Sequence, residues 1–330
     1  MNYLPAPDRY AGKMPYNRCG KSGLLLPAIS LGLWHNFGDT ARFDTCQEMI
    51  RCAFDHGITH FDLANNYGPA PGAAEETFGR ILQKNPQIRR EELVISSKAG
   101  HEMWPGPYGN GGSRKMLITS LEQSLRRMQL DYVDIFYSHR YDPDTPLEET
   151  LQALVDIVRS GKALYAGISK YPAAEAGFAY NYLRERDVPC LVYQGRYSLF
   201  NREPEAEIIR QANQHGAGFI AFSPLAQGLL TNRYLNGIPE DSRIARPEGF
   251  LKAEQLSPEM LSKIKSLHEI ATNRGQTLAE MALAWLLHNP LVTSVVIGAS
   301  SADQLLNNLK AVHYPPFTDE ELTAINRICL

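Results

Sequence analysis

Short apolar runs alternate along the chain with longer stretches in which apolar residues recur at helical spacing. The short runs predict eight strands, at residues 28–33, 58–63, 93–97, 133–138, 163–169, 190–194, 218–223 and 294–298. The longer stretches predict helices at residues 45–56, 74–83, 113–128, 147–160, 173–186, 205–215, 258–274 with 277–287, and 302–311. A strand followed by a helix, repeated in this way, is typical of parallel β-α-β units.

Local signals support several of the predicted helix ends. Thr277 with Glu280 three residues later forms a capping box, and Pro258 after Ser257 suits a first helical position. Glycines follow three of the predicted helices, namely Gly57, Gly161 and Gly216. Outside the β-α units we expect a hairpin over residues 16–27, a long loop over residues 230–256 and a C-terminal helix over residues 319–328.

Eight β-α units close naturally into a (β/α)8 barrel, the TIM-barrel fold. An open doubly wound sheet is the alternative, but its G-x-G-x-x-G fingerprint follows none of the early strands. No linker or low-complexity tract divides the chain. We therefore predict an α/β protein with a single domain over residues 1–330, a (β/α)8 barrel with an N-terminal β-hairpin and extra C-terminal helices.

The composition limits the classes of function. The chain has 330 residues, 44% hydrophobic and 21% charged, and a net charge of −3, which offers no general attraction to nucleic acid or anionic membranes. Its apolar runs are too short to span a bilayer, and its first residues do not form a secretory signal. Five cysteines without a C-x-x-C pair suit reduced thiols. We expect a cytoplasmic protein with no nucleic-acid or membrane partner.

Candidate chemistry lies where barrel enzymes place it, at the carboxyl ends of the strands. The second predicted strand delivers Asp62 and, five residues on, Tyr67; the third delivers Lys98 and the fourth His139. Each has a plain structural explanation, since aspartates cap helices, tyrosines pack over turns, and most lysines and histidines take no part in catalysis. Lys98 stands out because its strand carries it toward the barrel axis, where a buried ammonium needs a carboxylate partner such as Asp62.

Together the four residues fit the reduction of a carbonyl group, which needs a hydride and a proton. A phenol with a pKa near ~10 is a poor acid at neutral pH. We expect the Lys98 ammonium to favour the phenolate and so make Tyr67 a better proton donor, while Asp62 holds Lys98 in place. His139 would orient the carbonyl oxygen and, with Tyr67, form an oxyanion hole. This chemistry requires no metal.

The segment D-x-A-x-x-Y-G at residues 62–68, Lys98 in SSKAG and His139 in YSHR resemble the catalytic tetrad of the aldo-keto reductase superfamily. Within the chain, GKSGLLLPAISLGLWHNFG, FSPLAQGLLTNRYLNGIPEDSR and IGASSADQL look closest to the branch that contains bacterial L-glyceraldehyde 3-phosphate reductases and voltage-gated potassium channel β subunits. The resemblance implies an NADPH-dependent reductase of aldehydes or ketones with Tyr67 as general acid. That branch also implies a homo-oligomer, a tetramer or larger.

The resemblance implies that NADPH lies extended across the barrel mouth, without a Rossmann fold. The positions implied beside the nicotinamide are Gly32, Trp34, Asp62, Ser169, Gln194 and Tyr197. Those implied along the pyrophosphate are Ser223, Pro224, Leu225 and Gly228. Those implied at the adenosine and its 2′-phosphate are Arg233, Ser242, Arg243, Ser300, Gln304 and Asn308. A helix N-terminus at residue 300 independently suits a phosphate, and arginines favour NADP over NAD, although capping and solvation explain the same residues.

The substrate pocket is expected to contain Trp34, Tyr67, Trp104 and His139. The loop over residues 104–115 is rich in glycine and ends in Ser113-Arg114-Lys115, so it could hold a substrate phosphate, or it could be a plain surface loop. Lys170 and the segment QGRYS depart from the pattern of many relatives, and both changes touch the pocket wall. The sequence therefore leaves the substrate open among glyceraldehyde 3-phosphate, methylglyoxal and other small aldehydes.

Two other functions remain to be weighed. The first is an NADPH-binding regulatory or scaffold subunit like the channel β subunits, but those typically carry asparagine where this chain has His139. The second is a Schiff-base aldolase with Lys98 as nucleophile, but Asp62 beside Lys98 favours the charged amine. Both comparisons favour the reductase.

Overall fold

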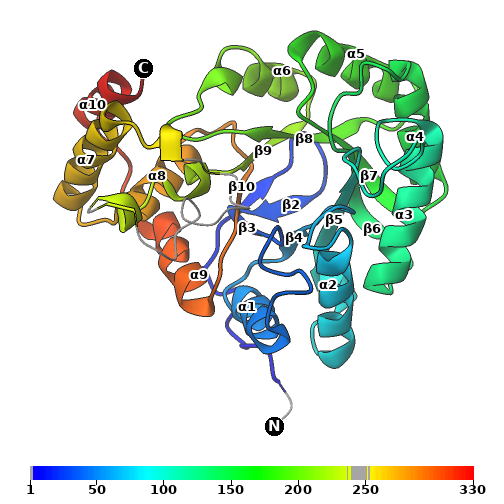
Figure 1. Cartoon of the computed structure of the whole chain (residues 1–330), viewed down its shortest axis with the longest axis horizontal. Coiled ribbons are helices and arrows are strands. Elements are labelled where there is room, and N and C mark those ends of the chain that lie inside the picture. Colours follow the sequence, from blue (N-terminus) through cyan, green and yellow to red (C-terminus); the bar gives the residue numbers. More distant parts are fainter. Residues whose placement is uncertain (1–2, 236, 239–250, 252) are drawn as a thin grey trace.

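A computed structural model describes residues 3–235, 237–238, 251 and 253–330 of the chain. Parallel strands close into a barrel in the order β10-β3-β4-β5-β6-β7-β8-β9, with helices around it (Figure 1). The barrel strands are β3 (Ile29–Gly32), β4 (His60–Asp62), β5 (Val94–Ala99), β6 (Val133–Ser138), β7 (Ala163–Ser169), β8 (Cys190–Arg196), β9 (Gly218–Phe222) and β10 (Ser294–Ile297). The predicted (β/α)8 barrel is confirmed.

The outer layer consists of helices that follow the strands. Their bounds are α1 (Phe43–Asp55), α2 (Ala73–Lys84), α3 (Arg114–Met128), α4 (Leu147–Arg159), α5 (Ala173–Arg184), α6 (Ile208–Gln214), α7 (Pro258–Asn273), α8 (Leu278–His288), α9 (Ala302–Leu309) and α10 (Asp319–Cys329). The capping box at the start of α8 forms as predicted between Thr277 and Glu280. Within the described ranges, no helix has the length and apolar character needed to cross a membrane.

Several elements differ in their bounds from the sequence prediction; β5, for example, continues to Ala99, two residues beyond its predicted end. Helix α6 begins at Ile208 rather than near residue 205, because Glu203–Glu205, with Pro204 in it, forms a separate 3-10 turn. Strand β8 continues to Arg196, two residues beyond its predicted end. Of the predicted loop over residues 230–256, residues 236, 239–250 and 252 lie outside the described part of the chain.

The predicted N-terminal hairpin forms from β1 (Tyr16–Arg18) and β2 (Leu25–Pro27), which pair antiparallel. Its Cys19 and Leu26 are fully buried and pack in one apolar cluster with interior residues of the barrel such as Ile135, Val192 and Ile220. The hairpin therefore covers the end of the barrel opposite the carboxyl ends of the strands, and leaves that carboxyl end for the site.

The register of the strands brings polar side chains to one level of the barrel. Asp62 on β4 pairs with Ser96 on β5, and Ser169 on β7 pairs with Gln194 on β8. Lys98 is two residues after Ser96 on β5, and its side chain lies on the same face, because alternate residues of a strand point the same way. These positions fix the site described next.

Candidate active site

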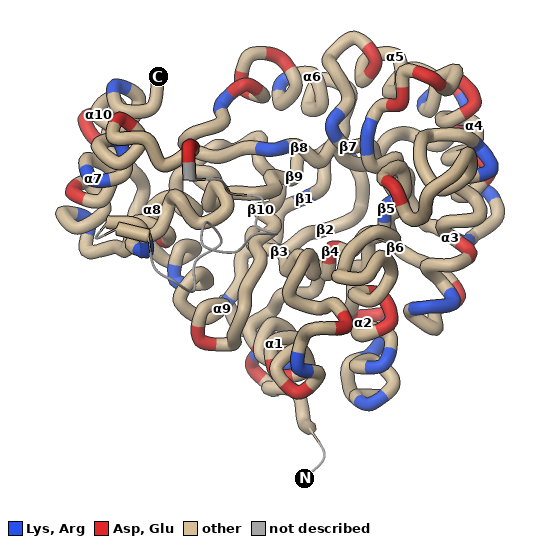
Figure 2. The backbone as a smooth tube through the Cα atoms, in the orientation of Figure 1, with Lys and Arg blue, Asp and Glu red and all other residues tan. Residues whose placement is uncertain are grey.

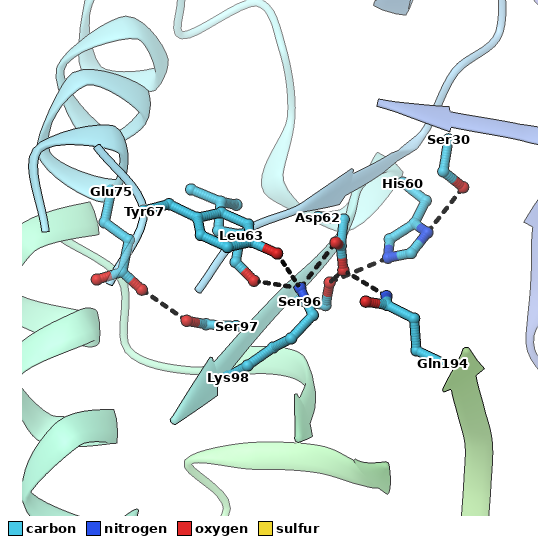
Figure 3. Close-up of polar contacts among 10 residues, drawn as sticks. All are labelled: Ser30, His60, Asp62, Leu63, Tyr67, Glu75, Ser96, Ser97, Lys98 and Gln194. Atoms are coloured by element: carbon cyan, nitrogen blue, oxygen red, sulfur yellow. Dashed lines mark hydrogen bonds and ion pairs between the residues drawn. The ribbon is translucent and has the colours of Figure 1, made fainter. Parts of the chain in front are cut away.

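Asp62 and Lys98 form an ion pair at the carboxyl ends of neighbouring strands β4 and β5. Lys98 Nζ lies 2.7 Å from Asp62 Oδ2, and the two side chains are 0% and 2% exposed. Lys98 Nζ also donates to the carbonyl oxygen of Leu63 at 2.6 Å. Asp62 Oδ1 accepts hydrogen bonds from Ser96 Oγ at 2.7 Å and from Gln194 Nε2 at 3.0 Å (Figure 3). These additional bonds offset the cost of removing the pair from water.

The charges of this pair depend on each other. Burial acts to raise the pKa of Asp62, but Lys98, His60 and the hydrogen bonds together hold it below its ordinary value. Burial lowers the pKa of Lys98, and the charges of Asp62 and Glu75 oppose that change. Asp62 is therefore a carboxylate, and the two short bonds from Lys98 Nζ to oxygen acceptors fit an ammonium ion.

Tyr67 lies in the loop after β4, with its hydroxyl 3.5 Å from Lys98 Nζ. Burial, followed by the charge of Asp62, raises the pKa of Tyr67 well above its ordinary value. This reverses the expectation that Lys98 lowers the pKa of Tyr67. The reason is geometric, since Lys98 makes its shorter bonds to Asp62 and Leu63, and the buried carboxylate acts on the phenol as well. Tyr67 is thus fully protonated at neutral pH.

His139 follows β6 and faces Tyr67 across the same space. The two ring centres are 6.0 Å apart in an edge-on arrangement, and His139 is 5% exposed. Burial, with the charges of Lys98 and Lys170, lowers the pKa of His139 well below its ordinary value. The imidazole is therefore neutral, and a neutral imidazole donates from one ring nitrogen and accepts at the other. His139 can donate a hydrogen bond without carrying charge.

A chain of buried polar groups supports Asp62 from within the barrel (Figure 3). Ser96, which donates to Asp62, also contacts His60 Nε2 at 3.1 Å. His60 Nδ1 lies 2.8 Å from Ser30 Oγ, which in turn lies 2.6 Å from Ser294 Oγ. Burial lowers the pKa of His60 to about 4, so this ring is neutral. This network was not predicted from the sequence. Its only signal there is a serine or histidine within each of several otherwise apolar strands.

A cavity of about 470 Å³ opens above the ion pair. Asp62, Tyr67 and His139 line it, whereas Lys98 contacts Tyr67 from beneath. Of the remaining residues named from the sequence, those that line the cavity are Gly32, Trp34, Ser169, Gln194, Ser223, Pro224, Leu225, Gly228, Arg233 and Gln304. Lys170 and Arg196 of the segment QGRYS, expected at the pocket wall, also line it. The lining residues that were not predicted for the site include Asn66, His101, Phe222, Gln227, Thr231 and Tyr234. The cavity is elongated, because its lining runs from β3 and β4 to the start of α9.

Several residues named from the sequence lie away from this cavity. Tyr197 is buried outside it, where its hydroxyl donates to Glu205 at 2.6 Å and its ring packs 5.4 Å from Trp285. Phe222, at the end of β9, does line the cavity, as do Trp34 and Tyr67. Trp104 is 38% exposed on the outer loop. Ser300 and Asn308 are also absent from the lining, and Ser242 and Arg243 lie outside the described residues.

The loop over residues 104–115 does not bring its cations to the cavity. Arg114 forms an ion pair with Asp156, and Lys115 lies over the ring of Tyr108 at 5.1 Å. Ser113 caps α3 by accepting a hydrogen bond from the backbone N–H of Met116. These contacts occupy the groups that the sequence analysis considered for a phosphate.

The polar groups of the cavity fit an amide-bearing, phosphorylated ligand. Ser169 Oγ is buried and has no hydrogen-bond partner among the described residues. Gln194 beside it turns its amide nitrogen toward Asp62. Ser223, Ala226 and Gln227 adopt left-handed backbone conformations next to Gly228, and this loop and Arg233 line the other half of the cavity. A nicotinamide carboxamide suits the first part, and a pyrophosphate suits the second.

Known proteins are similar to this chain over most of its length. The model of the aldo/keto reductase family matches residues 28–329 of the chain. The L-glyceraldehyde 3-phosphate reductases of Escherichia coli K12 and O157:H7 are each 54% identical to it, over 99% of this chain and 95% of their own length. A probable voltage-gated potassium channel subunit beta of Arabidopsis thaliana is 38% identical, over 92% of each chain.

Proposed function

Because the chain belongs to the aldo/keto reductase family and is an oxidoreductase, we propose that it uses NADPH to reduce small aldehydes and ketones to alcohols, with Tyr67 as the general acid. The observation that carries the proposal is the convergence of a protonated Tyr67, a neutral His139 and the buried Lys98–Asp62 pair on one cavity. Candidate substrates are L-glyceraldehyde 3-phosphate, methylglyoxal and other small aldehydes.

The protein's own groups handle the carbonyl oxygen. Tyr67 and His139 face each other at a ring separation of 6.0 Å, so an oxygen atom between them can accept a hydrogen bond from each. As negative charge grows on that oxygen, the phenolic proton of Tyr67 transfers to it, because an alkoxide is a stronger base than a phenolate. The resulting phenolate lies next to the Lys98 ammonium, which stabilises it.

The raised pKa of Tyr67 serves this role. It keeps the proton on the donor until an alkoxide develops, so the protein does not lose it to solvent beforehand. Neutral His139 adds a hydrogen bond and no positive charge that would compete with Lys98. Asp62 keeps Lys98 fixed, since their 2.7 Å contact is buried.

NADPH, when bound, supplies the hydride for the carbonyl carbon. We assign Ser169 and Gln194 to the nicotinamide carboxamide and the loop from Ser223 to Gly228 to the pyrophosphate, since these residues line successive parts of the cavity. Arg233 and Gln304 line the far end, and an arginine there favours the 2′-phosphate of NADPH over the hydroxyl of NADH.

The alternative functions receive less support. A purely regulatory NADPH-binding subunit has no need for a complete proton-donating site, and here His139 stands at the cavity with Tyr67. A Schiff-base aldolase needs a free amine, whereas Lys98 Nζ donates to both Asp62 and Leu63. All five cysteines are unpaired thiols, which suits the reducing cytoplasm that we propose. A homo-oligomer remains a prediction for light scattering to measure.

The decisive variant is Tyr67→Phe. We expect it to lower kcat with NADPH and glyceraldehyde 3-phosphate by about 10²–10⁴-fold while the Kd for NADPH stays unchanged, because general-acid catalysis alone is removed. The matched control is Tyr180→Phe, which deletes a buried hydroxyl without a hydrogen-bond partner among the described residues of the chain, on α5. Turnover retained in Tyr67→Phe would remove Tyr67 from this role. The same assay with NADH and with methylglyoxal ranks cofactor and substrates by kcat/KM.

A further inference from the structure

We propose that Lys170, Arg196 and His101 form a subsite for the phosphate group of a phosphorylated aldehyde, an inference that rests on the proposed function. Lys170 directly follows β7, Arg196 ends the adjacent strand β8, and His101 follows β5. All three side chains line the cavity that contains Tyr67 and His139. The subsite and the reacting carbonyl therefore share one space.

The distances place this subsite one side chain away from the catalytic imidazole. The rings of His101 and His139 meet edge-on with centres 4.4 Å apart, and Lys170 Nζ lies 2.8 Å from His101 Nε2. Neutral His101 accepts one hydrogen bond from the Lys170 ammonium, which leaves two N–H donors for a ligand. Lys170 Nζ and the Arg196 guanidinium lie 5.9 Å and 6.0 Å from the centre of the same Phe222 ring, so the two cations converge on one part of the wall.

Within the described part of the chain, no carboxylate pairs with the cations of this subsite. Among ion pairs between residues that the structure describes, none includes Lys170 or Arg196. Asp62, a carboxylate in the cavity lining, is already paired with Lys98. Figure 2 shows acidic and basic residues interspersed over the outer helices, and the whole chain has a net charge of −3. The excess of cations is thus a local property of the cavity.

The ionisation of these groups reflects the same crowding of cations. Burial, with the charges of Lys98, Arg196 and Arg140, lowers the pKa of Lys170 to about 8. Burial, followed by the charge of Lys170, lowers the pKa of His101 to about 4. A phosphate dianion bound here would relieve the repulsion, and an uncharged aldehyde would not.

The backbone also holds Lys170 in an unusual position. Its φ of 55° lies in the left-handed region, which a lysine seldom occupies, and its N–H donates to the carbonyl oxygen of Gln194 at 3.3 Å. Unfavourable backbone conformations of this kind persist mainly where surrounding contacts impose them, often at binding sites. Contacts with neighbouring residues therefore hold Lys170 at the cavity wall, next to Ser169.

Glyceraldehyde 3-phosphate and glyceraldehyde differ by the phosphate alone, so their comparison isolates the subsite. We expect Lys170→Met to lower the ratio of kcat/KM for the phosphorylated to the unphosphorylated aldehyde by about tenfold or more, since a charge-assisted hydrogen bond is lost. Inorganic phosphate should compete with glyceraldehyde 3-phosphate in the native enzyme and compete much more weakly in the variant. Lys115→Met is the matched control, because it removes the same charge outside the cavity.

The possible results separate three situations. An unchanged ratio in Lys170→Met refutes the subsite. An equal loss with both aldehydes, together with a weaker Kd for NADPH in a fluorescence titration, assigns Lys170 to the cofactor's own phosphates and also refutes it. If the native enzyme reduces neither aldehyde, the proposed function fails. The subsite is then tested by calorimetry, which measures the binding of inorganic phosphate to the NADP-loaded native protein and to Lys170→Met. Binding that Lys170→Met abolishes supports the subsite, whereas absent or unaltered binding contradicts it.

Discussion

Replacing Lys98 with methionine removes the positive member of a fully buried pair and keeps most of its volume. At the observed 2.7 Å, two unit charges attract by about 6 kcal/mol for an effective dielectric constant of about 20, which bounds the loss from above. Asp62 Oδ1 retains its bonds from Ser96 and Gln194, but Oδ2 loses its donor. We therefore expect Lys98→Met to reduce the free energy of unfolding by about 3–5 kcal/mol.

The assay is urea unfolding of Lys98→Met, Asp62→Asn and the double variant. The slope m, which relates the free energy of unfolding to the urea concentration, should be the same in all of them. Asp62→Asn should cost less than Lys98→Met, because Lys98 keeps its bond to the Leu63 carbonyl and can release its proton. The double variant should be more stable than Lys98→Met by about 2 kcal/mol, since it leaves no unpaired buried charge. Additive losses, or a loss below about 1 kcal/mol for Lys98→Met, would show that the pair is not buried and coupled as described.

Two further predictions concern stability. The pKa of His60 is lowered from 6.5 to about 4, so its contribution to stability is complete above pH 6.5 and is lost as the pH falls toward 4. Between pH 7.5 and 4.5, the free energy of unfolding of His60→Asn should therefore fall by about 3 kcal/mol less than that of the native protein in urea titrations. Equal losses of this free energy in the two proteins would contradict a neutral, buried ring. In helix α2, a Cβ on Gly79 would lie 2.6 Å from the carbonyl oxygen of Met128, so Gly79→Ala should destabilise by about 1–3 kcal/mol in thermal unfolding. Gly177→Ala in α5 is the matched control, because its Cβ would meet only the end of a flexible glutamine at 2.9 Å.

The position of the proposed catalytic residues could be predicted because it follows from the strands. Asp62 and Lys98 lie near the ends of apolar runs, and in a parallel barrel all such ends meet on one face. Tyr67 and His139 were found in the same way, since Tyr67 lies five residues after the end of β4 and His139 directly follows β6. Periodicity and the strand-end rule were enough for the fold and for this constellation.

Details that depend on packing could not be predicted. Tyr197 was expected beside the nicotinamide, but β8 runs two residues further than its pattern indicates, and Tyr197 then turns toward Trp285 on α8. Phe222, which lines the cavity, looks in the sequence like one more apolar residue of β9. The direction of the change in the pKa of Tyr67 also depends on how Lys98 divides its hydrogen bonds, which spacing alone does not fix.

The hairpin formed by β1 and β2 has a consequence for the kinetics of the enzyme. Because it covers one end of the barrel, the cofactor and substrate that we propose would share the opening at the carboxyl ends of the strands. The cofactor, whose nicotinamide we propose to lie against Asp62 and Ser169, would be covered by the substrate. In a shared entrance the cofactor would then have to bind before the substrate and leave after it. We therefore expect the covered end of the barrel to impose a compulsory order of binding and release, and product-inhibition patterns measure that order.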